Sequence, residues 1–248
     1  MDDVLNISPA DDAVSGRTAG PEVSFLRPTH RLLLSSALML FIELALIRWL
    51  GSNVLHLSYF SNFVLLGSFL GIGLGFLVAR TEARMLPWSP VFLAALVGFV
   101  RFFPVEINRT SGTIIYFTSI TRKTVGPPVW VTLPLIFVVT AAILIGPAEA
   151  VGRCFKHLKP LDAYRIDLLG SILGILSFTA MSFLRAPSVA WGVIVALVFV
   201  ALLLPAITFP HALGVLTAGA LVVMLGAESA TPGITWSPYY KVKTTEFS

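Results

Sequence analysis

Charged residues are scarce in this chain of 248 residues: they make up 12% of it, whereas hydrophobic residues make up 56%. Soluble domains carry about 25% charged residues. A chain of this length folding in water could not cover so apolar an interior with so few charges. The composition therefore excludes an ordinary soluble domain and predicts a membrane protein.

Cysteine and histidine are also rare. Cys154 is the single cysteine, so a disulfide within the chain is excluded. The sequence lacks the GxSxG, HExxH and Walker motifs and any paired-carboxylate cleft that typify soluble active sites. We therefore assign no catalytic, cofactor-binding or metal-binding residue. The four histidines are scattered without metal-ligand spacing, at His30, His56, His157 and His211.

The net charge of +4 does not indicate nucleic-acid binding. No run of Lys and Arg with interleaved aromatics is present, and the basic residues lie beside apolar segments. Positive charge beside apolar spans is typical of membrane proteins. We expect the lipid bilayer, and no nucleic acid, as a partner.

Seven apolar segments approach the roughly 20 residues that cross a bilayer as a helix. The third is short and ends near Arg101, so a re-entrant or interfacial helix is the alternative there. We predict an all-α polytopic membrane protein with six to seven transmembrane helices. The segments are Leu32–Leu50, Tyr59–Val78, Pro90–Phe103, Val129–Gly146, Tyr164–Leu184, Ser188–Ala206 and Phe209–Ala227.

These segments divide the chain into three parts. Residues 1–31 are polar, with acidic first residues unlike a signal peptide, and predict a mostly disordered tail. Residues 32–227 predict the helical bundle, and residues 228–248 a short C-terminal β-strand stub. Within the bundle, Pro104–Pro128 predicts a folded surface loop with a little strand.

The distribution of Lys and Arg favours a cytoplasmic N-terminus in the inner (plasma) membrane. The first outer loop, Gly51–Ser58, would then carry neither residue type. Arg109, Arg122, Lys123 and Arg185 oppose this orientation, because they would lie outside. It places these basic residues inside: Arg27, Arg31, Arg80, Arg84, Arg153, Lys156, Lys159 and Arg165.

Two of the predicted helices carry glycines four residues apart, which lie on one helical face. In a bilayer, such small residues let helix backbones approach closely. The helix-packing residues we predict are Gly67, Gly71 and Gly75 on the second segment, and Gly170 and Gly174 on the fifth. Leu66–Ile72 and Leu169–Ile175 also match at six positions. Segments three apart run in opposite directions, so this match raises an inverted three-helix repeat as a hypothesis.

The intramembrane polar candidates that we single out within the apolar segments are Glu43, Arg48 and Asp167. A charged side chain at the bilayer centre costs about 2.5–3.5 kcal/mol on insertion scales, so it usually faces protein or water. One interpretation is a cation or proton site involving Glu43 and Asp167. The favoured interpretation is hydrogen bonding between helices that locks the bundle.

Three stretches together resemble the membrane-spanning N-terminal region of spermidine-synthase-like proteins, whose bundle is related to the major facilitator type. They are Glu43–Leu50, then Tyr164–Gly174, and then the C-terminal Trp236, Ser237, Pro238, Tyr239 and Tyr240, followed by Lys241 and Val242. The resemblance implies that the third stretch is the first strand of an aminopropyltransferase domain.

Two departures from this family change the expected function. Tyr240 stands where the family usually has Gln, and the family's nucleotide loop, ribose-holding acid and catalytic Asp would lie beyond Ser248. We therefore expect no aminopropyl transfer by this chain unaided. Seven spans with a cytoplasmic N-terminus would also place the C-terminus outside, away from the family's cytosolic substrate.

Three functions follow as hypotheses. The leading one is a non-catalytic membrane anchor or scaffold, working as a homo-oligomer or as an accessory subunit of a larger membrane complex. The second is a transporter of a small cation or polyamine. The third is the membrane half of an aminopropyltransferase whose catalytic domain is separate or missing from this sequence.

Overall fold

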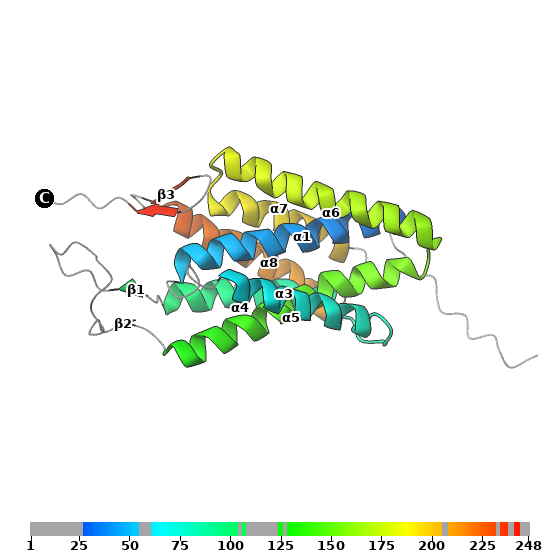
Figure 1. Ribbon diagram of the computed structural model, residues 1–248, viewed down its shortest axis with the longest axis horizontal. Helices are drawn as coiled ribbons and strands as arrows, with labels where there is room; N and C mark the ends of the chain where they lie inside the picture. The colour runs from blue at the N-terminus through cyan, green and yellow to red at the C-terminus, as the bar shows by residue number, and fades with distance from the viewer. Residues whose placement is uncertain are drawn as a thin grey trace, which may run out of the picture.

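The computed structural model describes residues 27–54, 61–103, 106–107, 124–125, 128–204, 208–231, 234–237 and 241–243. These residues form an elongated bundle of α-helices lying roughly side by side (Figure 1). The helices are α1 (Pro28–Asn53), α3 (Ser61–Val78), α4 (Ser89–Phe102), α5 (Val129–Phe155), α6 (Pro160–Phe183), α7 (Ser188–Leu203) and α8 (Phe209–Ser229), with a short 3₁₀ turn η1 (Leu86–Trp88) before α4.

Each predicted apolar segment overlaps one of these helices, so the predicted helical architecture is confirmed for the described residues, although α5 continues nine residues beyond the predicted Val129–Gly146. Four helices, α1, α5, α6 and α8, are long and apolar enough to cross a membrane. The apolar cores of α3, α4 and α7 are shorter, so seven spans stay a prediction. The helix α1 begins at Pro28, inside the predicted tail, of which residues 1–26 lie outside the described residues.

Proline explains where several helices begin. A proline stands in the first turn of α1, α4, α6 and α8. It fits there because the first amides of a helix have no intrahelical acceptor. Pro134 and Pro147 instead lie inside α5, which continues through both. Membrane helices tolerate such prolines because neighbouring groups satisfy the freed carbonyls.

The helices pack in pairs around the centre of the bundle. The helix α3 packs on α5, α6 packs on α1, and α7 packs on α8, while α1 and α5 also contact each other. The helix α4 contacts α5 and α8. One continuous apolar core joins these helices, with Leu38, Ile42, Ile143, Phe199 and Leu221 nearly inaccessible.

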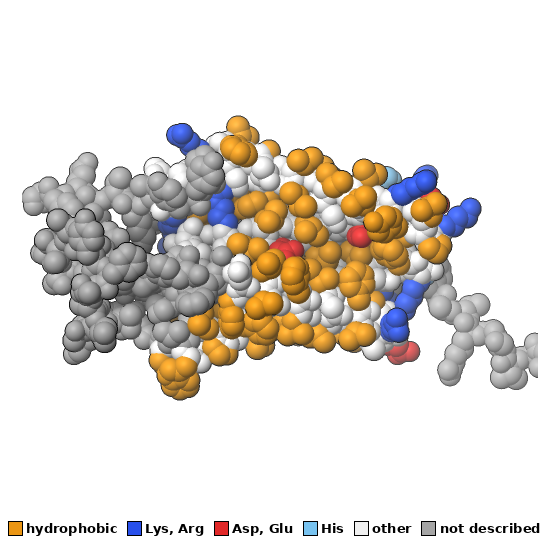
Figure 2. All heavy atoms as spheres, viewed as in Figure 1, with side chains coloured by type: hydrophobic (Ala, Val, Ile, Leu, Met, Phe, Trp, Pro, Cys, Tyr) orange, Lys and Arg blue, Asp and Glu red, His pale blue; other side chains and the backbone are white. Residues whose placement is uncertain are grey.

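The face of the bundle seen in Figure 2 is apolar along most of its length, and Lys and Arg side chains gather toward its two ends. The window of α6 that defines its span is only 17% buried, with Leu169 and Leu176 each 60% exposed. Exposed leucines on this scale suit contact with lipid tails. The surface therefore supports a membrane protein, and the membrane and the orientation stay predictions.

Two short antiparallel strand pairs lie at the same end of the bundle (Figure 1). Strands β1 (Glu106–Ile107) and β2 (Thr124–Val125) pair within the predicted surface loop, whose residues 108–123 lie outside the described residues. Strands β3 (Ile234–Trp236) and β4 (Lys241–Lys243) form a C-terminal hairpin. Here the structure differs from the predicted single strand, because the chain reverses after Trp236 and β3 finds its partner within the same segment.

Candidate functional site

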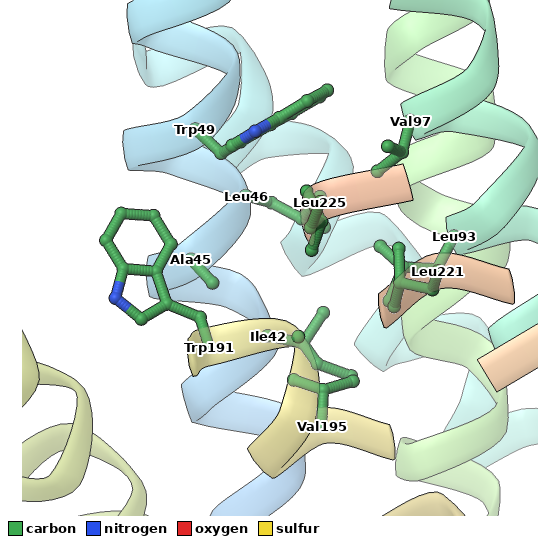
Figure 3. A pocket seen from close by; sticks show the side chains of 11 residues that line it. Ile42, Ala45, Leu46, Trp49, Leu93, Val97, Trp191, Val195, Leu221 and Leu225 are labelled. Atoms are coloured by element: carbon green, nitrogen blue, oxygen red, sulfur yellow. The ribbon is translucent and has the colours of Figure 1, made fainter. Parts of the chain in front are cut away.

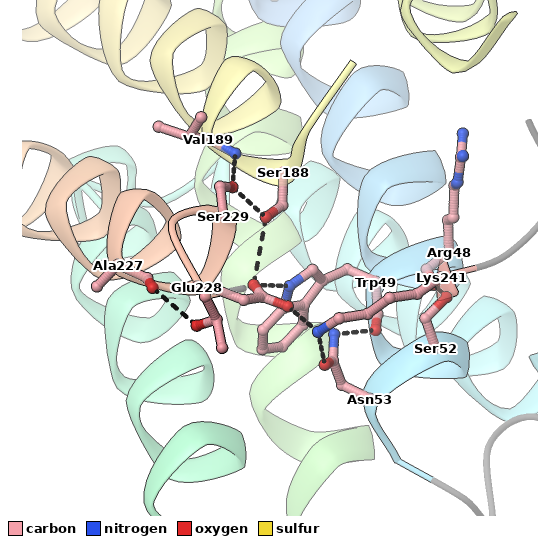
Figure 4. Close-up of polar contacts among 11 residues, drawn as sticks. Arg48, Trp49, Ser52, Asn53, Ser188, Val189, Ala227, Glu228, Ser229 and Lys241 are labelled. Carbon is pink, nitrogen blue, oxygen red and sulfur yellow. Dashed lines mark hydrogen bonds and ion pairs between the residues drawn. The ribbon is translucent and has the colours of Figure 1, made fainter. Parts of the chain in front are cut away.

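A cluster of buried polar side chains lies where the C-terminal hairpin meets the ends of α1, α7 and α8. Glu228, in the last turn of α8, is 5% exposed. One of its carboxylate oxygens accepts a hydrogen bond from the indole of Trp49 at 2.9 Å and a longer one from the Ser188 hydroxyl at 3.3 Å. The other oxygen pairs with the Lys241 ammonium, which also donates to Asn53 Oδ1 at 2.9 Å (Figure 4).

A carboxylate at this place needs such partners. The C-terminal end of a helix carries partial negative charge, so an acid in the last turn of α8 is unfavourable by itself. Lys241 supplies the opposing charge from β4, and both side chains are less than 10% exposed. This buried ion pair therefore ties the hairpin to the bundle.

Arg48, near the end of α1, lies in a cage of three aromatic rings. Its guanidinium carbon is 4.9 Å from the ring centroid of Trp191, 5.5 Å from that of Trp236 and 6.0 Å from that of Phe178. Aromatic faces attract cations at these distances. The three rings come from α7, β3 and α6, so the cage joins three distant parts of the chain. We call Phe178, Trp191 and Trp236 the aromatic cage.

The guanidinium of Arg48 also donates hydrogen bonds to the Ser182 hydroxyl on α6 and to the carbonyl oxygen of Ser237. Trp236 is 5% exposed and meets Trp191 edge-on, with centroids 4.7 Å apart. Of the predicted stub residues, Trp236 and Ser237 therefore contact the bundle directly. Pro238, Tyr239 and Tyr240 lie outside the described residues.

Glu43 and Asp167 do not form one site. The Asp167 carboxylate accepts a hydrogen bond from the Ser36 hydroxyl, which links α6 to α1. Glu43 lies seven residues beyond Ser36 on α1, roughly 10 Å along the helix axis at 1.5 Å per residue. Glu43 is 5% exposed, and within the part of the chain that the structure describes its Oε1 atom has no hydrogen-bond partner. The geometry at Asp167 thus fits the favoured interpretation, whereas Glu43 is a buried polar group with one unpartnered carboxyl oxygen.

The predicted packing glycines lie where helix backbones come close together. A Cβ atom built on Gly71 would overlap the backbone of Ala141 on α5, with 2.8 Å to its Cα. At Gly67 and Gly75 it would come within 3.0 Å of Phe137 O and 2.6 Å of Ile145 O. No side chain fits in these spaces, so a glycine face on α3 sets its distance to α5.

The glycines of α6 meet α1 in the same manner. A Cβ atom on Gly170 would lie 2.6 Å from the Leu33 carbonyl oxygen, and one on Gly174 would overlap the backbone of Ala37, 3.1 Å from its Cα. Residue numbers rise together along both helices of each contact, so α6 and α1 are parallel, as are α3 and α5.

Another buried carboxylate, which sequence reasoning missed, lies at the opposite end of the bundle from Glu228. Glu149 on α5 is 2% exposed and accepts hydrogen bonds from the backbone amides of Met85, at 2.6 Å, and Leu86, at 3.1 Å. It also pairs with Arg153. Arg153 in turn donates to the carbonyl oxygens of Thr81 and Ala83, so these groups hold the connection between α3 and α4.

Glu149, Glu228 and Lys241 gave little signal in the sequence. Glu149 and Glu228 lie just beyond apolar runs, where a charged residue normally faces water or headgroups, and Lys241 lies in the polar C-terminal segment. The detectable hint was the position of both acids in the last part of a helix, an unfavourable place that calls for a cation.

A small cavity of about 40 Å³ lies between α1, α4, α7 and α8. Its lining is apolar and includes Ile42, Leu46, Leu93 and Leu221, with Trp191 at one side (Figure 3). Trp191 turns its indole nitrogen away from this cavity. An apolar cavity of this kind stays dry, so it offers no polar binding site.

Comparisons with family models, curated proteins and solved structures found no match to this chain. The resemblance to spermidine-synthase-like proteins therefore stays a prediction. The function is therefore inferred from the contacts described above.

Proposed function

We propose that this chain is an integral membrane anchor or scaffold that holds its C-terminal hairpin as a fixed mount at one end of the bundle. The observation that carries this proposal is the docking of the hairpin by the Glu228–Lys241 ion pair and by the packing of Trp236 on Trp191. Buried ion pairs joined to a hydrogen-bond network favour one arrangement over others, because breaking them leaves a charge unpaired. A hairpin held in one fixed position suits a protein that positions a partner.

We propose further that all seven helices cross the membrane and that the bundle consists of two inverted three-helix units, α1–α3–α4 and α5–α6–α7, with α8 between them. Exchanging α1 with α5, α3 with α6 and α4 with α7 converts the α3–α5 contact into the α6–α1 contact. It also converts α4–α5 into α7–α1 and α4–α8 into α7–α8, and all of these contacts exist.

The glycine contacts agree with this exchange in register. Gly67 and Gly71 meet Phe137 and Ala141, and Gly170 and Gly174 meet Leu33 and Ala37 in the same order. The arginines agree as well. Arg153 on α5 bonds carbonyl oxygens just beyond the end of α3, and Arg48 on α1 bonds Ser182 in the last turn of α6.

The spans are tested by labelling single cysteines from outside the cell. Glu82 follows α3 and Ala230 follows α8, at opposite ends of the bundle. In a Cys154→Ala background, we expect E82C and A230C to react with a membrane-impermeant maleimide from opposite sides. Labelling of both from the same side would overturn the proposed odd number of spans between them.

The anchoring role is tested with a hairpin-released variant. Glu228→Gln removes the charge that holds Lys241, and Glu82→Gln removes an exposed charge as the matched control. We expect a partner that co-purifies in mild detergent with the wild type and with E82Q to be lost with E228Q. A lone monomer in all three preparations would contradict the scaffold. An aminopropyltransferase-type domain is the partner that we propose from the resemblance.

Transport of a small cation is the second candidate, because inverted repeats are common in transporters and Glu43 places a buried, unpartnered carboxyl oxygen within α1. The dry cavity of about 40 Å³ is too small for a polyamine in this conformation. Uptake of a polyamine into proteoliposomes that disappears with Glu43→Gln would favour transport over anchoring. Uptake that is unchanged in the variant would argue against this mechanism.

A further inference from the structure

Positive charge exceeds negative charge at the junction of the hairpin and the bundle. Two cations, Arg48 and Lys241, lie there with one carboxylate, Glu228, whose oxygens are taken by Lys241, Trp49 and Ser188. The ion pairs within the described residues are Arg153–Glu149 and Lys241–Glu228, so Arg48 has no carboxylate partner among them. Glu43 is five residues away on α1, about 140° around the helix, which turns once in about 3.6 residues.

Unsatisfied hydrogen-bond donors gather at the same place. The Nε atom of Arg48 and the indole nitrogens of Trp191 and Trp236 are buried and have no hydrogen-bond partner among the described residues. Trp191 is 3% exposed and Trp236 is 5% exposed. The groups are mutually close, since the guanidinium is 4.9 Å and 5.5 Å from the two rings and the rings are 4.7 Å apart. All three atoms can only donate, so they share a need for an acceptor.

We propose that the Arg48 guanidinium and the indole N–H groups of Trp191 and Trp236 bind a phosphate-type oxyanion, supplied by a phospholipid headgroup or as free phosphate. Such a ligand accepts hydrogen bonds from several donors, and its charge opposes the unpaired guanidinium. Arginine is well suited to phosphate because its planar donors match the phosphate oxygens. A water molecule supplies no charge and brings two donors of its own, which this donor-rich place does not require.

The position along the bundle fits a headgroup. Arg48 lies five residues before the end of α1, and three tryptophans, Trp49, Trp191 and Trp236, lie beside it. Tryptophan and arginine near helix ends are typical of the membrane–water interface, the level of the lipid phosphates. This inference does not depend on the anchoring role proposed above, because it uses only the contacts of the cage.

The experiment uses the purified full chain and two probes. Equilibrium dialysis with radiolabelled inorganic phosphate detects the free anion, and native mass spectrometry from phosphatidylglycerol or phosphatidylcholine nanodiscs detects retained lipid. We expect saturable phosphate binding, retained phosphatidylglycerol, or both. Arg48→Gln should weaken binding at least tenfold. Arg101→Gln, which removes an exposed charge at the same end of the bundle, should leave it unchanged.

Trp191→Phe and Trp236→Phe keep an aromatic ring beside Arg48 and remove only the N–H donors, so they decide the matter if R48Q does not fold. We expect a severalfold loss of affinity from each and a larger loss from the pair. Phosphate binding lost in these variants identifies free phosphate, and phosphatidylglycerol lost in them identifies a headgroup. Absence of binding to both probes, or wild-type binding by the tryptophan variants, would overturn the proposal.

Discussion

The helix pairs α3–α5 and α6–α1 share two close backbone contacts made by glycines, and they differ at the next position along the helix. In both pairs, two glycines four residues apart rest on backbone groups of the neighbouring helix. Four residues later, α3 has Gly75, where a built Cβ atom would lie 2.6 Å from the carbonyl oxygen of Ile145. At the corresponding position α6 has Phe178. The ring of Phe178 packs edge-on against Phe41 and forms part of the aromatic cage.

At the ends of the two helix pairs, an arginine has different kinds of partner. Arg153 has a carboxylate on its own helix, Glu149, one turn earlier. Arg48 has aromatic faces and hydroxyl or carbonyl oxygens instead. Small residues therefore set the same backbone spacing in the middle of each helix pair. The side chains at the ends differ in their charge and in their bonding partners. The ends are the places where function is expected to reside.

The largest effect on stability is expected from breaking the Arg153–Glu149 ion pair. Glu149→Gln leaves Arg153 without its counter-charge and weakens the acceptor of two backbone amides. Removing one partner of a buried pair costs about 3–5 kcal/mol. We expect a loss near the lower end, about 3 kcal/mol, because the Arg153 side chain is 26% exposed and can rehydrate. Unfolding titrations in mixed micelles measure it. A loss no greater than that of the exposed Glu82→Gln would contradict the importance of this pair.

A smaller effect is expected at the glycine contacts. Gly71→Leu and Gly174→Leu force the helix backbones apart, and overpacking costs about 1–3 kcal/mol. Gly73→Leu on α3 is the matched control, because nothing lies within 4 Å of a Cβ built there. Thermal unfolding in detergent compares the three variants. Equal stability of G71L and G73L would show that the α3–α5 contact does not control the fold.

The C-terminal end of α6 offers a stabilising change. Arg185 has a backbone φ of 56°, and its amide and that of Ala186 donate to the carbonyl oxygens of Ser182 and Met181. This closing turn favours glycine, since a left-handed conformation costs other residues about 1–2 kcal/mol. Arg185→Gly should raise stability by about 0.5–1 kcal/mol, part of the gain being lost to the entropy of glycine in the unfolded chain. Arg101→Gly, within the helix α4, should instead lower stability in the same assay.

The smallest effect on stability is expected at the Ser36–Asp167 hydrogen bond, a contact between α1 and α6 that the α3–α5 pair lacks at the equivalent position. Asp167 stands three residues before Gly170 and bonds Ser36, whereas Val64 stands three residues before Gly67. Hydrogen bonds between membrane helices contribute about 0.6 kcal/mol on average. A double-mutant cycle of Ser36→Ala and Asp167→Ala should give a coupling of that size. A coupling of zero would show that this hydrogen bond is dispensable for the packing of α6 on α1.

Sequence reasoning anticipated features whose cause is local. Each helix follows from an apolar run such as Ser188–Leu203, and the glycine faces follow from a spacing of four. It missed the Glu228–Lys241 pair and expected a lone strand after the bundle. No local pattern reveals that Lys241 turns back onto the end of α8, because a charge beside an apolar segment is equally common at an exposed interface.

The sequence alone determined that this chain forms apolar helices, four of them long enough to cross a membrane, since composition and the length of apolar runs decide which surface can face lipid. It also determined which helices can approach closely, because only glycine leaves room for a neighbouring backbone. Tertiary structure alone decided that Arg48 meets Trp191 and Trp236, residues more than 140 positions away in the chain. That meeting depends on the directions and depths of several packed helices, and these arise from the sum of many weak contacts that no single segment encodes.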